Sequence, residues 1–374
     1  MIIAVNTRLL LKGKIEGIGR FSFEVLKRIT TGHKEHTFIF LFDRTYDPSF
    51  IFSNNIIPVV LFPPSRHPFL WYWFFEYSVT KALKKYKADI FITTDGWLST
   101  KTNVKTLQVL HDLHYENYPE FLPYLTRKYY QYFFPRFVKK ANQIVTVSNF
   151  CKYEIMKTYA IENDKIDVVF NSTRNEYYPL PSAEILKIEK EYTNGQPYFL
   201  FIGPIHQRKN LNNAIKAFAQ YKNATKDGIK LVVTGSNMWR NFGKPIELQD
   251  QDVNKDIVYT GYLKPQELFR VTGAASCLLF VSFYEGFGLP ILEAMSCNVP
   301  VITSNRAAMP EVAGDAAILV NPDSVDSISN AMSKIQNDNH LRQTLILKGQ
   351  INVKRYSWDN TANILWNSVL KVIK

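Results

Sequence analysis

Short apolar runs alternate with longer amphipathic stretches along most of the chain, and this alternation limits the folds that it can adopt. The short runs are typical of buried β-strands, and the longer stretches repeat their apolar residues with the period of a helix. Such alternation predicts an α/β protein whose parallel sheets are covered by helices on both faces. The predicted strands are residues 2–7, 37–42, 57–61, 88–93, 106–110, 143–147, 166–170, 198–202, 230–234, 257–259, 277–281, 299–303 and 317–320. The predicted helices are residues 18–29, 71–85, 127–139, 210–221, 265–272, 290–296 and 325–337.

A charge-rich stretch divides the predicted elements into two sets. Residues 179–195 are rich in charge, and the turn signal Asn194-Gly195-Gln196-Pro197 precedes a new strand. A chain of 374 residues is long enough for two domains, each with its own core. We therefore expect a first domain at residues 1–190 and a second at 191–356. Two doubly wound domains that face each other leave a central cleft along the carboxyl ends of their strands, where ligands bind.

Charge and cysteine content narrow the class of protein. The formal net charge of +12 predicts an anionic partner. The three cysteines form no C-x-x-C pair and leave one unmatched, which indicates neither a disulfide framework nor a zinc site and fits a reducing cytoplasm. The start of the chain lacks the pattern of a secretory signal. The most apolar window, residues 69–75, is far shorter than the ~20 residues that span a bilayer.

Residues 283–305 combine a glycine-rich turn with two glutamates eight positions apart. Pro290 suits the first position of a helix, which puts Glu285 in the loop before it and Glu293 in its first turn. The backbone N–H groups of Gly286, Phe287, Gly288 and Leu289 then lie at a helix N-terminus, where polar or anionic ligands are favoured. Carboxylates accept hydrogen bonds from the diols of a sugar or ribose. For either glutamate alone, a solvated or dipole-stabilising role is the simpler interpretation.

Taken together, this segment resembles the E-x7-E signature of retaining glycosyltransferases of family 4, which have the GT-B fold. The resemblance rests on Glu285, Gly286, Phe287, Gly288, Pro290, Glu293 and Ala294, on Val299-Pro300-Val301-Ile302, and on Pro310-Glu311-Val312-Ala313-Gly314. It implies two Rossmann-like domains and a last helix, residues 357–374, that crosses back to pack on the first domain. It also implies that Glu285 and the amides of Gly286 to Leu289 hold the transferred sugar and that Glu293 holds the nucleotide ribose.

The loop after the first strand of the second domain carries Gly203 and the adjacent pair Arg208 and Lys209. A guanidinium and an ammonium group side by side suit a diphosphate, although an isolated pair is more often a solvated turn. In family 4 an Arg-Lys pair at this point holds the donor diphosphate, so the resemblance implies that role here. It also makes Tyr262 and Leu263 candidate contacts of the nucleotide base.

Three residues of the first half match the family at single points. Gly17 and Gly19 form a glycine turn that opens a helix, matching the loop that lies against sugar and acceptor. His111 ends an apolar strand, where a lone histidine is more often structural; in the family a histidine here faces the anomeric carbon of the sugar.

Two patterns outside the family motifs bear on metals and partners. Asp250-Gln251-Asp252 has the form of a metal-binding D-x-D, but its polar surroundings favour a solvated loop, and we expect no metal or other cofactor. Residues 121–153 contain no acid but several Lys and Arg interleaved with aromatics. This pattern suggests a basic, aromatic surface for an anionic membrane, on the inner face of the plasma membrane. The alternative is an aromatic core under a wet lysine face. Without a nucleic-acid-binding motif, we expect no nucleic-acid partner.

The sequence thus predicts a retaining hexosyltransferase that works in cell-surface polysaccharide synthesis. Its co-substrates would be a nucleotide sugar, GDP-mannose or a UDP-hexose with mannose preferred, and a saccharide or lipid-linked acceptor. Two alternatives stay open. One is another GT-B enzyme, a sugar-nucleotide epimerase or a phosphorylase. The other is a non-catalytic scaffold that binds sugar or membrane.

Overall fold

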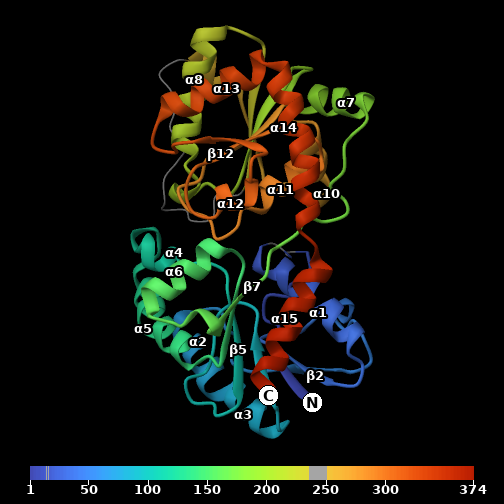
Figure 1. The fold of residues 1–374 in the computed structure, drawn as a ribbon, viewed down its shortest axis with the longest axis vertical. Helices are drawn as coiled ribbons and strands as arrows, with labels where there is room; N and C mark the ends of the chain where they lie inside the picture. Colours follow the sequence, from blue (N-terminus) through green and yellow to red (C-terminus); the bar gives the residue numbers. More distant parts are fainter. Residues whose placement is uncertain (14, 16, 236–250) are drawn as a thin grey trace. The chain divides into compact units, whose positions relative to one another are not determined.

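The computed structural model describes residues 1–13, 15, 17–235 and 251–374 and contains two compact units (Figure 1). The first consists of Met1–Asn171 together with Ser357–Lys374, and the second of Ser172–Tyr356. This division puts α7 (Ser182–Thr193) in the second unit, where it contacts α10 (Pro265–Gly273). The boundary between the units therefore lies before the expected position at residue 190.

The first unit is built on a parallel sheet of seven strands in the order β3-β2-β1-β4-β5-β6-β7. Its strands are β1 (Ile2–Asn6), β2 (Thr37–Phe42), β3 (Ile56–Val60), β4 (Ile90–Thr93), β5 (Lys105–Leu110), β6 (Gln143–Thr146) and β7 (Ile166–Val168). Its longer helices are α1 (Ile18–Gly32), α2 (Pro68–Trp73), the π-helical η2 (Phe74–Val79), α3 (Thr80–Lys85), α5 (Tyr124–Lys140), α6 (Asn149–Tyr159) and α15 (Trp358–Ile373). Short elements are η1 (Pro48–Phe50), α4 (His114–Asn117), η3 (Pro119–Phe121) and η4 (Asn163–Lys165).

Helices cover both faces of this sheet. Figure 1 shows α1 and α15 on one side and α2, α5 and α6 on the other. The last helix, α15, packs against α1 as expected, and Arg28 of α1 pairs with Asp359 of α15 at 2.6 Å. At the other end of α15, Lys371 pairs with Asp167 of β7 at 2.6 Å. The C-terminal helix is thus part of the first unit.

The second unit has a parallel sheet of six strands in the order β10-β9-β8-β11-β12-β13. Its strands are β8 (Tyr198–Ile202), β9 (Lys230–Thr234), β10 (Ile257–Gly261), β11 (Cys277–Phe280), β12 (Val301–Ser304) and β13 (Ala317–Val320). Besides α7 and α10 its helices are α8 (Leu211–Thr225), α9 (Gln251–Asn254), α11 (Leu289–Ser296), α12 (Met309–Ala313), α13 (Val325–Asn337) and α14 (Asn339–Asn352), with the short η5 (Gln207–Lys209) and η6 (Val353–Arg355). Helices α8 and α13 pack together over one face of the sheet.

The strand order of each sheet reverses once, and this reversal locates its binding edge. In the first sheet the order changes direction between β1 and β4, and in the second between β8 and β11. In open α/β sheets, ligands bind outside the carboxyl ends of the strands at such a switch point. The loops that follow β8 and β11 are therefore expected to hold a ligand, and so are those that follow β1 and β4. The helices that the structure describes include none long and apolar enough to cross a bilayer.

Candidate active site

The loop after β8 is held to the neighbouring strand of the switch point. Gly203 follows the strand with φ of +153°, which favours glycine, and a Cβ there would lie 3.2 Å from the Cδ of Lys209. Asn210 follows η5 in the left-handed conformation, with φ of +62°, and its Nδ2 donates to the carbonyl oxygen of Val281 at 3.0 Å. These contacts position the two cations of η5, Arg208 and Lys209, beside the loop after β11.

Arg208 and Lys209 share one carboxylate, that of Glu285. Arg208 Nη1 lies 2.9 Å from Oε2, and Lys209 Nζ donates to Oε1 at 2.6 Å. All three side chains are largely buried, with 20%, 12% and 11% of their surface exposed. Two cations and one carboxylate leave the cluster with net positive charge, so it can still attract an anionic group.

The charge state of Glu285 is fixed by these neighbours. Burial raises the pKa of its carboxyl group, but the charges of Arg208 and Lys209 and the hydrogen bond from Lys209 outweigh burial and lower the pKa to about 2. Glu285 is therefore ionised throughout the neutral range and acts as an acceptor of hydrogen bonds.

One backbone bond and one side-chain bond tie the two loops together beside this cluster. The Phe283 N–H donates to the carbonyl oxygen of Arg208 at 2.9 Å, and Arg208 Nη1 donates to the carbonyl oxygen of Tyr284 at 2.5 Å. The cluster thus belongs to a preorganised edge of the sheet, as an electrostatic site requires.

The glycine-rich turn leads from Glu285 into α11, as the sequence predicts. The helix begins at Leu289, one residue before the expected start at Pro290. Gly288 precedes it with φ of +109°, a conformation that side chains rarely adopt. Phe287 is buried and packs edge-on against Tyr356, with ring centroids 5.8 Å apart. Gly288 therefore lets the backbone turn directly at the helix start, close to Glu285.

Glu293, one turn into α11, faces an arginine that the sequence analysis did not single out. Arg174 Nη2 lies 3.7 Å from Glu293 Oε1 and donates to the Tyr177 hydroxyl at 3.1 Å. Burial lowers the pKa of the Arg174 guanidinium, but Tyr177 and Glu293 raise that pKa by more than burial lowers it. The pKa of Arg174 is therefore raised overall, and the group stays charged. No sequence signal marks Arg174, because it lies in an irregular segment 119 residues before its partner.

Tyr262 and Leu263 follow β10, which is the edge strand of the second sheet. Strand β9 lies between β10 and β8. Tyr262 is 49% exposed, and the preceding Gly261 has φ of +69°. The structure thus places these two residues on a different loop from the charged cluster, at the same carboxyl edge of the sheet.

His111, Gly17 and Gly19 lie in the first unit. His111 Nε2 contacts the Thr94 carbonyl oxygen at 2.8 Å, and burial lowers the pKa of the imidazole despite that bond and nearby carboxylates, so the ring is neutral at pH 7. Gly17 has φ of +46° before α1, and a Cβ on Gly19 would lie 2.8 Å from the carbonyl oxygen of Leu9. Gly19 thus has a packing reason to be glycine, independent of any ligand.

A second ion pair that the sequence analysis missed lies at the switch point of the first sheet. Arg8, just after β1, contacts Asp95, just after β4, with Nε 2.5 Å from Oδ2. The guanidinium lies 4.6 Å from the ring of Trp97, and Asn6 Nδ2 donates to Asp95 Oδ1 at 2.8 Å. Residues 87 positions apart meet here only because β1 and β4 are neighbours in the sheet.

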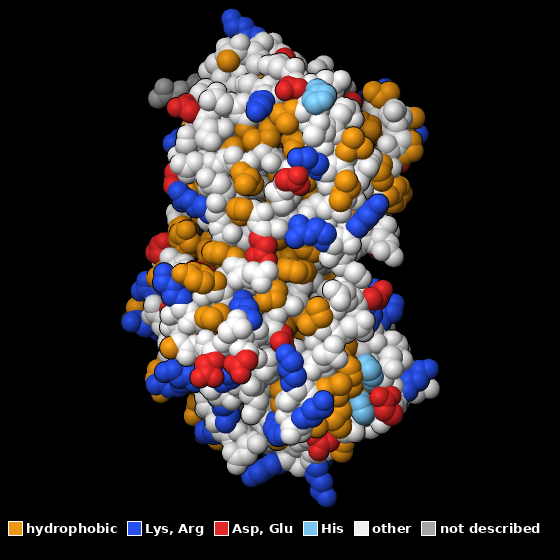
Figure 2. All heavy atoms as spheres, viewed as in Figure 1, with side chains coloured by type: hydrophobic (Ala, Val, Ile, Leu, Met, Phe, Trp, Pro, Cys, Tyr) orange, Lys and Arg blue, Asp and Glu red, His pale blue; other side chains and the backbone are white. Residues whose placement is uncertain are grey.

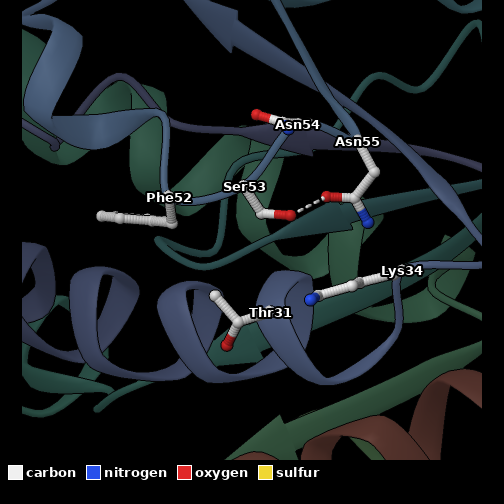
Figure 3. A pocket seen from close by; sticks show the side chains of 6 residues that line it. All are labelled: Thr31, Lys34, Phe52, Ser53, Asn54 and Asn55. Atoms are coloured by element: carbon white, nitrogen blue, oxygen red, sulfur yellow. Dashed lines mark hydrogen bonds between the residues drawn. The ribbon is translucent and has the colours of Figure 1, made fainter.

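Two other features do not form part of this site. A pocket of about 520 Å³ lined by Thr31, Lys34, Phe52, Ser53, Asn54 and Asn55 lies before β3, at the amino end of the strands, and Asn55 accepts a hydrogen bond from Ser53 within it (Figure 3). Asp250 of the D-x-D pattern lies outside the described residues, while Gln251 and Asp252 begin α9. Among the residues that the structure describes, no group of three or more His, Cys, Asp or Glu is placed to hold a metal ion.

Two family models match consecutive parts of the chain. The model of Glycosyltransferase Family 4 matches residues 15–174, and the model of Glycosyl transferases group 1 matches residues 183–351, which includes the charged cluster and α11. The chain belongs to the group 1 glycosyltransferases of family 4. It is therefore a hexosyltransferase of a family whose members use nucleotide-sugar donors.

Two curated relatives are similar to this family 4 glycosyltransferase over most of their length. It is 29% identical over 363 residues to O-antigen chain mannosyltransferase B of Escherichia coli, covering 94% of each chain. It is 27% identical over 300 residues to O-antigen chain mannosyltransferase RfbU of Salmonella typhimurium, covering 80% of this chain and 79% of the relative.

Solved structures share the GT-B fold of this glycosyltransferase. Sucrose-phosphate synthase from Thermosynechococcus elongatus superposes with a TM-score of 0.78 at 18% identity, covering 99% of this chain and 98% of that one. HepE of Anabaena, in complex with UDP-glucose, superposes with a TM-score of 0.70 at 15% identity over 99% of both chains. The expected architecture of two Rossmann-like sheets and a returning C-terminal helix is thus confirmed.

Proposed function

We propose that this family 4 enzyme is a retaining mannosyltransferase that moves mannose from GDP-mannose to a hydroxyl of a saccharide or lipid-linked acceptor, in cell-surface polysaccharide synthesis. The observation that carries the proposal is the pair of cations held on Glu285 at the switch point of the second sheet. The preference for mannose rests on the relatives that are O-antigen mannosyltransferases.

Arg208 and Lys209 would stabilise the diphosphate as it leaves. Charge develops on the leaving β-phosphate in the transition state, and two fixed cations in a largely buried site stabilise it without reorganisation. This role needs no metal. When the diphosphate approaches, it competes with Glu285 for both cations, and the carboxylate becomes available to accept hydrogen bonds from the sugar hydroxyls.

Glu293 would hold the ribose, with Arg174 fixing the orientation of its carboxylate. The amides of Gly286 to Leu289, at the start of α11, would contact the sugar. Gly203, Tyr262 and Leu263 would line the nucleotide part of the donor site.

Transfer would proceed on one face of the sugar. The bond from the anomeric carbon to the phosphate oxygen breaks, the acceptor oxygen bonds to the same face of that carbon, and the acceptor proton passes to the departing phosphate oxygen. The enzyme therefore needs no nucleophile, and Glu285 has a binding role. His111, neutral and bonded to Thr94, would support the positive charge of the sugar ring, with Gly17 and Gly19 along the acceptor.

The proposed cell compartment rests on the thiols and the acceptor class. The side chains of Cys151, Cys277 and Cys297 are all buried thiols, which suits a reducing cytoplasm. A lipid-linked acceptor would bring the enzyme to the inner face of the plasma membrane.

The test combines donor binding with product analysis. Calorimetric titration with GDP-mannose, UDP-glucose, UDP-galactose and UDP-N-acetylglucosamine should show GDP-mannose bound most tightly, and NMR of the product should show the anomeric configuration of the donor retained. Binding of none of these donors would support a scaffold instead. Conversion of a donor without acceptor, or only with free phosphate, would indicate an epimerase or a phosphorylase.

A further inference from the structure

Arg8 is a largely buried cation that the proposed donor chemistry does not use. It follows β1 at the carboxyl edge of the first sheet, and 10% of its side-chain surface is exposed. On the face drawn in Figure 2, by contrast, many Lys and Arg side chains project into solvent, where their charges are hydrated. A guanidinium withdrawn from water needs specific partners, so the partners of Arg8 bear directly on its role.

Only one of the three guanidinium nitrogens of Arg8 has a hydrogen-bond partner among the described residues. Nε contacts Asp95 Oδ2 at 2.5 Å, and no described residue accepts a hydrogen bond from Nη1 or Nη2. Arg44, after β2, differs, because its Nε and Nη2 contact the buried Asp43 at 2.6 and 2.8 Å. Buried polar groups are normally paired. The N–H groups on Nη1 and Nη2 of Arg8 are therefore suited to a ligand.

Asp95 is fully engaged in holding this arginine. Its Oδ1 atom accepts hydrogen bonds from Asn6 Nδ2 at 2.8 Å and from Thr93 Oγ1 at 2.9 Å, while Oδ2 faces Arg8. The guanidinium also lies over an aromatic ring, with its Cζ atom 4.6 Å from the ring centroid of Trp97. A carboxylate on one edge and a ring on one face hold the guanidinium in a fixed orientation before a ligand arrives.

Arg8 lies at the same sheet edge as His111. The carbonyl oxygen of Thr94, in the loop after β4, is 2.8 Å from His111 Nε2. Leu9, next to Arg8, lies against the start of α1, where its carbonyl oxygen would be 2.8 Å from a Cβ on Gly19. The loops after β1 and β4 and the start of α1 thus meet at the switch point of the first sheet, where open α/β sheets bind ligands.

The charges around Arg8 indicate the class of ligand. Burial raises the pKa of the Tyr130 hydroxyl on α5, and the charge of Arg8 lowers it. The carboxylates of Asp95 and Asp112 raise the same pKa, so both lie near this cation. An anionic ligand would gain little from a guanidinium whose charge a carboxylate already offsets. The hydroxyl oxygens of a neutral sugar can accept its hydrogen bonds without bringing further charge to the site.

We propose that Arg8 binds the acceptor and selects a neutral saccharide, donating hydrogen bonds from Nη1 and Nη2 to hydroxyl oxygens of its terminal sugar. Asp95 is the positioning residue that holds the guanidinium for this contact. The inference rests on the proposed function, because it takes the acceptor hydroxyl to belong to a saccharide bound on the first unit. It adds the charge class of that saccharide and a residue outside both the E-x7-E segment and the Arg-Lys pair.

The first experiment measures binding of sugars to the full chain by saturation-transfer-difference NMR, with and without GDP. The probes are the methyl α-glycosides of mannose, glucose, galactose and N-acetylglucosamine, and mannose 6-phosphate as an anionic sugar. The wild type should bind at least one glycoside more tightly than mannose 6-phosphate. Arg8→Lys keeps the charge beside Asp95 but loses the planar fork, and it should bind that glycoside about tenfold less tightly. The matched control Arg44→Lys alters another arginine–aspartate pair and should bind as the wild type does.

Transfer kinetics then separate acceptor binding from a purely structural role. With GDP-mannose as donor and the bound glycoside as acceptor, Arg8→Lys should raise the acceptor KM about tenfold and leave kcat within about twofold of the wild type. Donor hydrolysis without acceptor should not change. Asp95→Asn should raise the same KM, because an amide holds the guanidinium less firmly than a carboxylate does. A purely structural pair would lower the melting temperature of these variants without changing the acceptor KM.

The inference is wrong if the wild type binds none of the methyl glycosides, or if it binds mannose 6-phosphate more tightly than all of them. It is also wrong if Arg8→Lys binds the glycoside as tightly as the wild type, or if Arg44→Lys weakens binding equally. Should Arg8→Lys fail to fold, Arg8→Met/Asp95→Asn removes both charges together and is held to the same expectations. Failure of the wild type to bind any nucleotide sugar would overturn the proposed function instead, and glycoside binding without nucleotide would still test Arg8.

Discussion

Lys209 donates a hydrogen bond to Glu285 across 2.6 Å and thereby joins the loops that follow β8 and β11. With Arg208 on the other carboxylate oxygen, the pair makes a compact charged cluster at the switch point of the second sheet. A carboxylate between two cations resists protonation, and this property should give the cluster a measurable effect on stability.

The stability of the protein should depend on Glu285 in acid. Its pKa is lowered from 4.5 to about 2, so ionised Glu285 stabilises the fold above pH 4.5, and this contribution disappears as the pH falls through 2. The shift corresponds to about 3 kcal/mol. Urea unfolding at pH 6 and pH 3 should therefore show a larger loss for the wild type than for Glu285→Gln. Equal losses in the two proteins would mean that the carboxyl group titrates normally.

Arg174 should matter for donor affinity more than for the chemical step. Our proposal is that it orients Glu293, which lies on α11 and is 3.7 Å from Arg174 Nη2 at its Oε1 atom. Arg174→Ala should raise the KM for the donor about tenfold and change kcat little. Steady-state kinetics with varied donor would measure this. Arg270→Ala is a suitable control, because Arg270 pairs on the surface with Glu184 and Glu191. A change confined to kcat would assign Arg174 a different role.

Gly19→Ala should destabilise the first unit. The added Cβ would lie 2.8 Å from the carbonyl oxygen of Leu9, a backbone atom that cannot move independently. We expect a loss of about 1–3 kcal/mol in the free energy of unfolding, measured by urea denaturation. Gly32→Ala, near the end of the same helix, meets no atom within 4 Å and serves as the control. A stable Gly19→Ala variant with weakened acceptor binding would instead support a ligand contact at this glycine.

The sheets were predictable because their strands are continuous apolar runs. The predicted strands 37–42, 198–202 and 230–234 agree with β2, β8 and β9 at both ends.

The helices α6, α7 and α14 were not predicted, because each buries few side chains: α6 buries Cys151, Ile155 and Tyr159. The sequence does contain a signal for the start of α6, because Ser148 is its N-cap residue. The Ser148 side chain accepts a hydrogen bond from the Cys151 N–H at 3.1 Å.

The contacts inside the candidate site were less predictable than its residues. Glu285 and Lys209 were each singled out, but their pairing spans 76 residues and depends on β8 and β11 being neighbours. Hydrophobic periodicity predicts where strands lie along the sequence, but it does not predict the order in which they pair in the sheet. Arg8 and Arg174 escaped notice for the same reason, because their carboxylate partners are remote in sequence.

The turnover number of Glu285→Gln measures whether the cluster of Arg208, Lys209 and Glu285 forms the sugar-donor site. The amide keeps the size of the side chain but removes the charge that the two cations share. We predict a kcat for mannose transfer from GDP-mannose that is about 100- to 1,000-fold below that of the wild type. The matched variant Glu162→Gln, at an exposed position of the first unit, should keep wild-type activity. Wild-type turnover by Glu285→Gln would contradict an essential role for this carboxylate.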